Sequence, residues 1–396
     1  MDYMKKSVKD VDVKGKKVLL RCDFNVPQDA DGNITDDKRI REALPTLRYL
    51  LDEGAAVIVC SHLGRPKGER KMKYTLTPVA KHLSELLGRE VSMSFDITGP
   101  DALRLCSEIQ PGQVVMLENL RFDPGEEKCD SEFSKKLSSF ADIYVNDAFG
   151  AAHRAHASIV GVAEYLPAVS GLLIEKELRV MGGAMENPEH PFIAIMGGAK
   201  VSDKLGLIGS FIGKCDAILI VGGMAYTFFK AMGGSIGSSI CDDKSLELVK
   251  DLMAHAEEKG TKIYLPLDTV VSDTFSNDGN FETVEAGHVP GTFMGMDIGP
   301  KTVEKYGEII KSAKTIVWNG PAGVFEMPNF ARGTEGIARA VAESEAVSII
   351  GGGDSAAAIE KLGLENKVTH VSTGGGAAIE FLEGLELPGI ACLLDK

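Results

Sequence analysis

Short apolar runs rich in β-branched residues recur along the chain, and amphipathic segments long enough for helices separate most of them. Ten such runs begin at residues 16, 55, 113, 141, 191, 217, 261, 314, 346 and 368. Segments between them, such as TPVAKHLSELLGRE (77–90), place apolar residues at helical spacing. Strands that alternate with helices form parallel sheets covered on both faces. The sequence therefore predicts an α/β fold built on parallel sheets.

The length of the chain indicates more than one domain. Its 396 residues exceed what one ordinary hydrophobic core organises, so two domains are expected. The segment AVSGLLIEKELRVMGGAMENPEHP (168–191) predicts a helix that ends at Gly182 and Gly183, followed by a proline-bounded turn. We therefore expect an N-terminal domain over 1–170, an interdomain helix and hinge over 171–185, and a C-terminal domain over 186–379.

Charge and composition exclude several classes of function. The net charge of -14 argues against nucleic acid or an anionic membrane as the main partner. No apolar run approaches the length of a membrane span, and the N-terminal stretch shows no secretory signal. Seven cysteines without a C-x-x-C pair indicate neither a disulfide framework nor a zinc site. These features favour a cytoplasmic protein whose thiols stay reduced.

Arginine and glycine are distributed unevenly between the two halves. Of 13 arginines, 11 lie at or before Arg179, whereas 30 of the 44 glycines follow residue 190. Arginine suits bidentate binding of carboxylate and phosphate. Glycines that follow strands let backbone N–H groups approach phosphates closely. The first half is therefore expected to bind a small polyanion, and the second half a nucleotide.

The stretch PFIAIMGGAKVSDKLG (191–206) predicts a strand, a break at two glycines and the start of a helix. It places Lys200 and Lys204 four residues apart in the first helical turn. There they would repel each other and face the positive end of the helix dipole. A bound phosphate would relieve both costs, although the stretch contains no Walker A motif. The alternative is a solvated helix end whose lysines only aid solubility.

Two other functions are compatible with parts of the pattern. GGGDSA (351–356) matches the G-x-G-x-x-A fingerprint of a nicotinamide-dependent dehydrogenase. However, it lies in the last strand–helix unit, and no acidic residue ends the next strand to bind a ribose. A two-lobed protein that closes on an anion without chemistry is the second alternative. No H-E-x-x-H pair supports zinc hydrolysis.

Eight motifs occur in an order that is typical of one enzyme family. They are RCDFNVP (21–27), SHLGRPKG (61–68), LENLRF (117–122), VNDAFGAAHRAHAS (145–158), GGAKVSDK (197–204), VWNGPAGVFE (317–326), GGGDSAAA (351–358) and STGGGAAIEFLEG (372–384). On these motifs the sequence resembles phosphoglycerate kinase over essentially its full length. The resemblance implies reversible phosphoryl transfer between 1,3-bisphosphoglycerate and MgADP, giving 3-phosphoglycerate and MgATP. It also implies a monomer with two Rossmann-like domains joined by a helical hinge, the tail 380–396 folding back onto the N-terminal domain.

The resemblance assigns site residues position by position. Catalytic roles would fall to Arg39, Lys200 and Gly376. The triose would be held by Asp23, Phe24, Asn25, Arg39, His62, Leu63, Gly64, Arg65, Arg121 and Arg154. The nucleotide would be held by Lys204, Gly295, Glu326, Gly352, Gly353, Asp354 and Ser355. Asp354 would also hold Mg²⁺, which prefers hard oxygen ligands.

Overall fold

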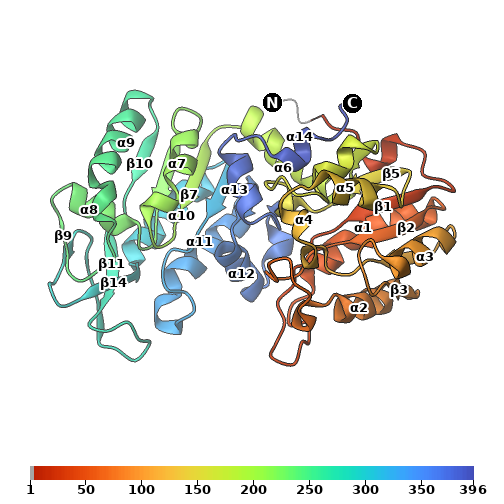
Figure 1. Cartoon of the computed structure of the whole chain (residues 1–396). Coiled ribbons are helices and arrows are strands. Elements are labelled where there is room, and N and C mark those ends of the chain that lie inside the picture. Colours follow the sequence, from red (N-terminus) through yellow and green to blue (C-terminus); the bar gives the residue numbers. More distant parts are fainter. Residues whose placement is uncertain (1–3) are drawn as a thin grey trace. The chain divides into compact units, whose positions relative to one another are not determined.

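The computed structural model describes residues 4–396, and the chain divides into two compact units (Figure 1). The first unit runs to Arg179 and also contains Glu386–Lys396, whereas the second unit spans Val180–Leu385. The division falls inside helix α6 (Leu172–Glu186). No helix in the described part of the chain is long and apolar enough to cross a membrane.

The first unit is built on a parallel sheet of six strands. Their spatial order is β3 (Val91–Met93), β4 (Val114–Met116), β2 (Ala56–Cys60), β1 (Lys17–Arg21), β5 (Ile143–Asn146) and β6 (Ala168–Ser170). Helices α1 (Lys38–Asp52) and α2 (Thr77–Leu87) pack their apolar side chains on one face. The other helices are α3 (Pro100–Glu108), α4 (Pro124–Glu127), α5 (Ser131–Ser138) and α14 (Pro388–Ala391).

Local sequence explains where a helix such as α2 begins and ends. Pro78 lies in its first turn, where a missing N–H costs no hydrogen bond. Gly88 ends the helix in the left-handed region at φ +64°, where a side chain would be strained. Between these residues Val79, Ala80 and Leu83 are buried on the face that meets the sheet. The apolar residues that recur at helical spacing in the sequence are thus the ones that pack against the sheet.

The C-terminal segment belongs to the first unit through backbone and side-chain hydrogen bonds. Lys6 donates its backbone N–H to the carbonyl of Leu394 at 2.8 Å, and Leu394 donates to the carbonyl of Ala168 at 2.9 Å. The buried amide of Asn146 donates to the carbonyl of Gly389 at 3.0 Å. The last residues of the chain therefore complete the edge of the first sheet beside β6.

The second unit contains a second parallel sheet of six strands. Their order is β10 (Lys262–Tyr264), β8 (Ala217–Ile220), β7 (Phe192–Met196), β15 (Thr315–Asn319), β16 (Val347–Gly351) and β17 (His370–Val371). The buried faces of α10 (Pro300–Lys311), α11 (Arg332–Glu343) and α12 (Gly353–Lys361) share one core with this sheet. The remaining helices are α7 (Leu205–Phe211), α8 (Ala225–Ala231), α9 (Leu246–Glu258) and α13 (Gly376–Leu382). The two sheets confirm the predicted α/β fold class.

The sequence did not predict a smaller antiparallel sheet in the second unit. Strands β12 (Phe281–Glu285), β11 (Asp268–Ser272) and β14 (Met294–Ile298) form it in that order. A short pair, β9 (Ser235–Ile236) and β13 (His288–Val289), lies nearby and shares a small core with β11. These strands matter for function because β14 supplies one wall of the cavity described below.

The expected end of the helix at Gly182 and Gly183 is wrong. Helix α6 continues through both glycines to Glu186. A glycine inside a helix costs about 1 kcal/mol relative to alanine. The neighbouring side chains of Met181 and Ala184 are buried, and each methylene removed from water contributes about 0.8 kcal/mol. Packing of these neighbours therefore offsets the weak helical preference of the glycine pair.

Candidate active site

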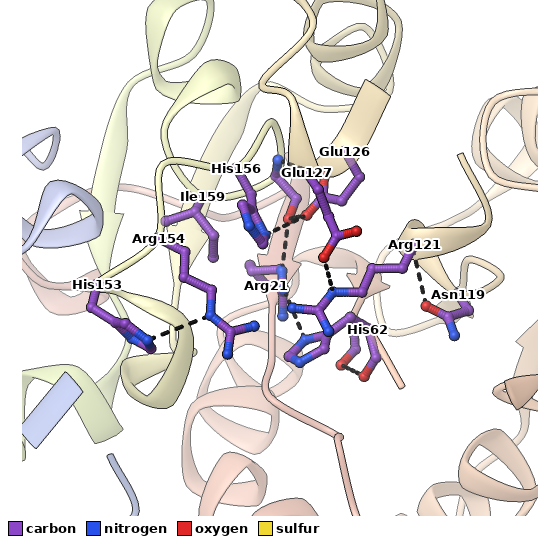
Figure 2. A network of polar contacts seen from close by, with 12 residues as sticks. Arg21, His62, Asn119, Arg121, Glu126, Glu127, His153, Arg154, His156 and Ile159 are labelled. Atoms are coloured by element: carbon purple, nitrogen blue, oxygen red, sulfur yellow. Dashed lines mark hydrogen bonds and ion pairs between the residues drawn. The ribbon is translucent and has the colours of Figure 1, made fainter. Parts of the chain in front are cut away.

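Arginine and histidine side chains gather at the carboxyl edge of the first sheet. Figure 2 shows Arg21, Arg121 and Arg154 grouped around His62. Arg21 ends β1, His62 follows β2, and Arg121 lies in the 3₁₀ turn η3 (Leu120–Phe122) that follows β4. Because parallel strands end at the same edge, residues distant in sequence meet there.

The loop after β1 is fixed by hydrogen bonds to α1 and to the loop after β2. Arg39 donates from Nη1 to Asp23 Oδ2 at 3.0 Å and to the carbonyl of Asn25 at 3.3 Å. Asn25 Oδ1 accepts a hydrogen bond from the backbone N–H of Gly64 at 2.8 Å. The N–H of the buried Phe24 donates to Ser61 Oγ at 2.9 Å. The structure thus brings together the predicted site residues of both loops.

The loop after β2 is held against the turn after β4 by Asn119. Its Oδ1 accepts from the N–H groups of Leu63 and Arg121, at 3.2 and 3.1 Å. Arg121 in turn donates from Nη1 to the carbonyl of Gly64 at 2.7 Å. Gly64 has φ +62°, and a Cβ there would lie 2.4 Å from the ring of Tyr74. Only glycine therefore fits this turn.

Positive charge exceeds its local compensation in this cluster. Burial holds the pKa of His62 well below its ordinary value, and four guanidinium groups act in the same direction, those of Arg21, Arg121, Arg154 and Arg39. Burial and then Arg154 also lower the pKa of Arg121. Arg65 lies exposed on the loop that follows β2. Several guanidinium groups around neutral histidine form a site suited to a small polyanion.

The second unit contains a cavity of about 780 Å³, which is within the range of small-molecule sites. Its backbone lining comes from glycines that follow β7, β8 and β15 and from β14, namely Gly198, Gly222, Gly223, Gly295 and Gly323. Apolar side chains such as Tyr226, Phe229 and Val324 line the rest. The predicted residues Glu326 and Asp354 lie on its wall. A cavity with apolar walls and a few carboxylates suits a nucleotide base and sugar.

Glycine is required at two places in the wall of this cavity. A Cβ at Gly295 would lie 1.7 Å from the hydroxyl oxygen of Tyr226, which is itself hydrogen-bonded to Thr269 at 2.6 Å. At Gly222, φ is +70° and a Cβ would lie 2.8 Å from the backbone nitrogen of Gly198. The turns after β7 and β8 therefore pack backbone against backbone, which leaves the cavity open beside them.

The prediction that Lys200 and Lys204 share the first turn of one helix is wrong. Lys200 precedes the 3₁₀ turn η6 (Val201–Asp203), and Lys204 precedes α7. The 3₁₀ turn η6 thus lies between the two lysines, and the α-helix begins only after Lys204. Lys200 is exposed, whereas burial lowers the pKa of Lys204 and the nearby carboxylates of Asp203 and Asp354 oppose that shift.

The sequence places Asn319 at a strand end, within the motif VWNGPAGVFE (317–326), but assigns it no role at the site. Asn319 ends β15, its side chain is fully buried, and its Oδ1 accepts a hydrogen bond from Lys204 Nζ. Its Nδ2 is buried and has no hydrogen-bond partner within residues 4–396. The turn at Gly351 and Gly352 lies beside that nitrogen. A buried unpaired donor is costly, so it marks a place for a ligand acceptor such as a phosphate oxygen.

The remaining predicted residues lie at the ends of β16 and β17. Gly352 has φ +87° and precedes α12, whose first turn contains Gly353, Asp354 and Ser355. The hydroxyl oxygen of the buried Ser355 accepts from the N–H of Gly320 at 2.6 Å. Gly376 is the first residue of α13, and Gly375 before it has φ +51°. Both helices therefore begin with glycine-containing turns at the same sheet edge.

The residues present fit a magnesium ion that arrives with a nucleotide. Among residues 4–396 no group of three or more acidic, histidine or cysteine side chains could hold an ion alone. Asp354 is an exposed carboxylate on the cavity wall. Mg²⁺ commonly binds one or two carboxylates together with substrate phosphates and water. A single carboxylate at this position matches that pattern.

Comparisons with known proteins agree with this arrangement. A model of the family "Phosphoglycerate kinase" matches residues 8–385. The solved phosphoglycerate kinase of Coxiella burnetii is similar with a TM-score of 0.90 and 40% identity, over 98% of each chain. That of Pyrococcus horikoshii OT3 is similar with a TM-score of 0.85 and 36% identity, also over 98% of each chain. The chain therefore belongs to the phosphoglycerate kinase family, whose glycolytic reaction transfers a phosphoryl group reversibly between 1,3-bisphosphoglycerate and ADP.

Proposed function

We propose that the phosphoryl group passes directly between a triose bound to the first unit and a nucleotide bound to the second. The observation that carries this proposal is the separation of two sites of different chemistry, an arginine cluster in one unit and a glycine-lined cavity in the other. No general base is needed, because the carboxylate that accepts the phosphoryl group is already ionised. Catalysis then consists mainly of positioning and charge stabilisation.

The triose is held by the arginine cluster of the first unit. Side chains of Asp23, Asn25, Arg39, His62, Arg65, Arg121 and Arg154 bind its charged and hydroxyl groups, and the backbone at Phe24, Leu63 and Gly64 lines the site. The guanidinium groups suit a substrate that carries both a carboxylate and a phosphate. The buried Arg121 Nε, which has no hydrogen-bond acceptor within residues 4–396 and only an ion-pair contact to Glu127 at 3.5 Å, supports an anion beside it.

The nucleotide is held by the cavity of the second unit. Gly295 lies against the base, Glu326 binds the ribose, and Lys204 with the turn from Gly352 to Ser355 binds the phosphates. Asp354 holds Mg²⁺, which when bound neutralises phosphate charge. Arg39 from the first unit, with Lys200 and Gly376 from the second, stabilises charge on the phosphoryl group in transit. The fit of Asp354 and the unpaired Asn319 Nδ2 support this placement.

We further propose that the protein works as a monomer in the cytoplasm. The glycolytic reaction of its family and the seven free cysteines, three of them exposed in part, support a reducing compartment. Each unit also carries one substrate site, so a second copy is not needed to complete either site.

A coupled assay of turnover and a separate stereochemical experiment test this mechanism. The protein is supplied with 3-phosphoglycerate and MgATP, and NADH consumption by glyceraldehyde-3-phosphate dehydrogenase reports turnover. In the stereochemical experiment, run without the coupling enzyme, the ATP carries an isotopically chiral γ-phosphate. A single direct transfer should invert the configuration at phosphorus in the 1,3-bisphosphoglycerate that is formed. Retention of configuration would indicate a phosphoenzyme and contradict the proposal. NADH consumption without the coupling enzyme would instead support a dehydrogenase.

Closure of the two units should accompany formation of the ternary complex. Two ligands held on separate units must approach to about 3 Å and lose bulk water before transfer. Helix α6, inside which the division between the units falls, is the expected hinge element. Small-angle scattering should give a smaller radius of gyration with both substrates bound than with either alone. An unchanged radius in the ternary complex would contradict closure.

A further inference from the structure

Arg21 is a buried charge at the centre of the first unit. It ends the central strand β1, and its side chain is only 1% exposed. A guanidinium removed from water needs compensating acceptors. Three groups surround it. Nε donates to Ser158 Oγ at 2.8 Å, Nη1 donates to the carbonyl of Cys22, and Nη2 faces His62 Nδ1 at 3.1 Å.

Ser158 connects Arg21 to the buried carboxylate of Glu126. Arg21 and Glu126 are labelled in Figure 2. The Ser158 hydroxyl donates to Glu126 Oε1 at 2.6 Å, and the Ser158 backbone N–H donates to Glu126 Oε2 at 3.0 Å. Both Ser158 and Glu126 are fully buried. Because the hydroxyl has one proton, it gives that proton to Glu126 and accepts from Arg21. The chain of contacts therefore has one direction, from the guanidinium through the hydroxyl to the carboxylate.

Contact with Arg21 determines which nitrogen of His62 carries the proton. A guanidinium has donors only and cannot accept a hydrogen bond. At 3.1 Å, His62 Nδ1 must therefore be the acceptor, and it has no proton. A ring without a proton on Nδ1 is neutral and carries its proton on Nε2. His62 thus has one ring donor, the N–H at Nε2.

We propose that Arg21, held by Ser158 and Glu126, is a positioning residue that fixes His62 as a neutral ring with its proton on Nε2. His62 then presents one hydrogen-bond donor to the anionic triose instead of a mixture of two tautomers. This role rests on the triose site proposed above. It gives a use to a buried polar network, Arg21–Ser158–Glu126, that no step of the phosphoryl transfer requires.

The charges around His62 also favour its neutral form. Arg121 approaches from the turn after β4, Arg154 from the loop after β5 and Arg39 from α1. Together with burial, these guanidinium groups keep the ring neutral when the pH falls below the ordinary pKa of histidine. His156 lies next to the same network, 3.9 Å from Glu126, and burial lowers its pKa to about 4. Proton binding by either ring is thus disfavoured near neutral pH.

Imidazole NMR tests the proposal on the full chain. Two-bond ¹H–¹⁵N correlation spectra of histidine-labelled protein distinguish the two neutral tautomers and the cation, and the variant His62→Gln assigns the His62 signal. The wild-type ring should show the Nε2–H tautomer alone from pH 8 to pH 5. Arg21→Met and Ser158→Ala should add the Nδ1–H tautomer, and Arg21→Met should also raise the pKa of His62. A wild-type Nδ1–H ring, or spectra unchanged in both variants, would overturn the proposal.

A matched control separates positioning from general loss of packing. Ser134 is also buried, and its hydroxyl donates to the carbonyl of Asp130 at 2.7 Å, away from this network. Ser134→Ala should leave the His62 spectrum and the KM for 3-phosphoglycerate unchanged. In Ser158→Ala that KM should rise about tenfold, the scale of one charge-assisted hydrogen bond, while the KM for MgATP stays constant. If the His62 spectrum changes without any rise in KM, the triose role of His62 is wrong but tautomer control by Arg21 stands.

Discussion

Lys200→Ala is expected to lower kcat by roughly a hundredfold, about 3 kcal/mol, which is the scale of losing one preorganised donor to developing charge. Phosphoryl transfer spreads negative charge over three equatorial oxygens in the transition state. Lys200 is exposed and lies just before η6. An interaction made only in the transition state lowers kcat when removed. The KM for MgATP should therefore move little.

Lys204→Ala should behave differently, because Lys204 is assigned to phosphates that are present throughout the reaction. Its Nζ is already held by Asn319 Oδ1, and the side chain is half-buried. Loss of an interaction common to ground and transition states mainly raises KM. Lys250→Ala, on the exposed face of α9, is the matched control and should change neither constant. If Lys200→Ala changes only KM, the transition-state assignment of Lys200 is wrong.

Arg39→Ala is expected to lower kcat by roughly a hundredfold or more, as the loss of a charged donor to the moving phosphoryl group would. A second effect adds to this loss. Arg39 pairs with Asp23 at 3.0 Å, so its removal leaves a carboxylate unpaired beside the bound anion. An unpaired carboxylate near an anionic substrate repels it and opposes its binding. The KM for 3-phosphoglycerate should therefore rise together with the fall in kcat.

The same helix provides the control for Arg39. Arg41 lies in α1, is 59% exposed and pairs with Asp37, the N-cap residue of that helix. Such an exposed pair contributes at most about 1 kcal/mol to stability. Arg41→Ala should leave both kinetic constants unchanged in the coupled assay. Equal losses of activity in Arg39→Ala and Arg41→Ala would mean that α1 as a whole, and not the Arg39 guanidinium, supports the reaction.

Hydrophobic runs predicted every strand of the second parallel sheet and four of the six strands of the first. All six strands of the second parallel sheet lie within the predicted apolar runs, and its four inner strands are largely buried on both faces. In the first sheet the missed strands are β3 and β6, the two edge strands, each of three residues. These two strands of three residues are too short to give a distinct apolar run. The antiparallel sheet was missed because β12 is largely exposed.

Residues of the candidate site could be proposed from sequence where a motif contains them, and not where their proposed role depends on a contact between distant segments. Asp23, His62 and Arg121 lie in motifs at the ends of predicted strands, so the sequence indicated them as candidates. The roles of Asn319 and Glu126 depend on contacts between segments far apart in the chain, Lys204 with Asn319 and Ser158 with Glu126. An amide at the end of a central strand was the available indication for Asn319. Nothing local marks Glu126, which lies in a short polar helix.

Calorimetric titration of the full chain with each substrate tests the central claim, that triose and nucleotide bind to different units. Arg154→Met should weaken binding of 3-phosphoglycerate at least tenfold and leave the Kd for MgADP unchanged. The new methyl group of Gly295→Ala would overlap Tyr226, so this variant should weaken the binding of MgADP and leave the Kd for 3-phosphoglycerate unchanged. Two control variants should change neither affinity. Arg104→Met removes an exposed ion pair of the first unit, and Gly291→Ala adds a methyl group in open space in the second unit. Weakening of both ligands to the same extent in either site variant would contradict the division of the two substrates between the units.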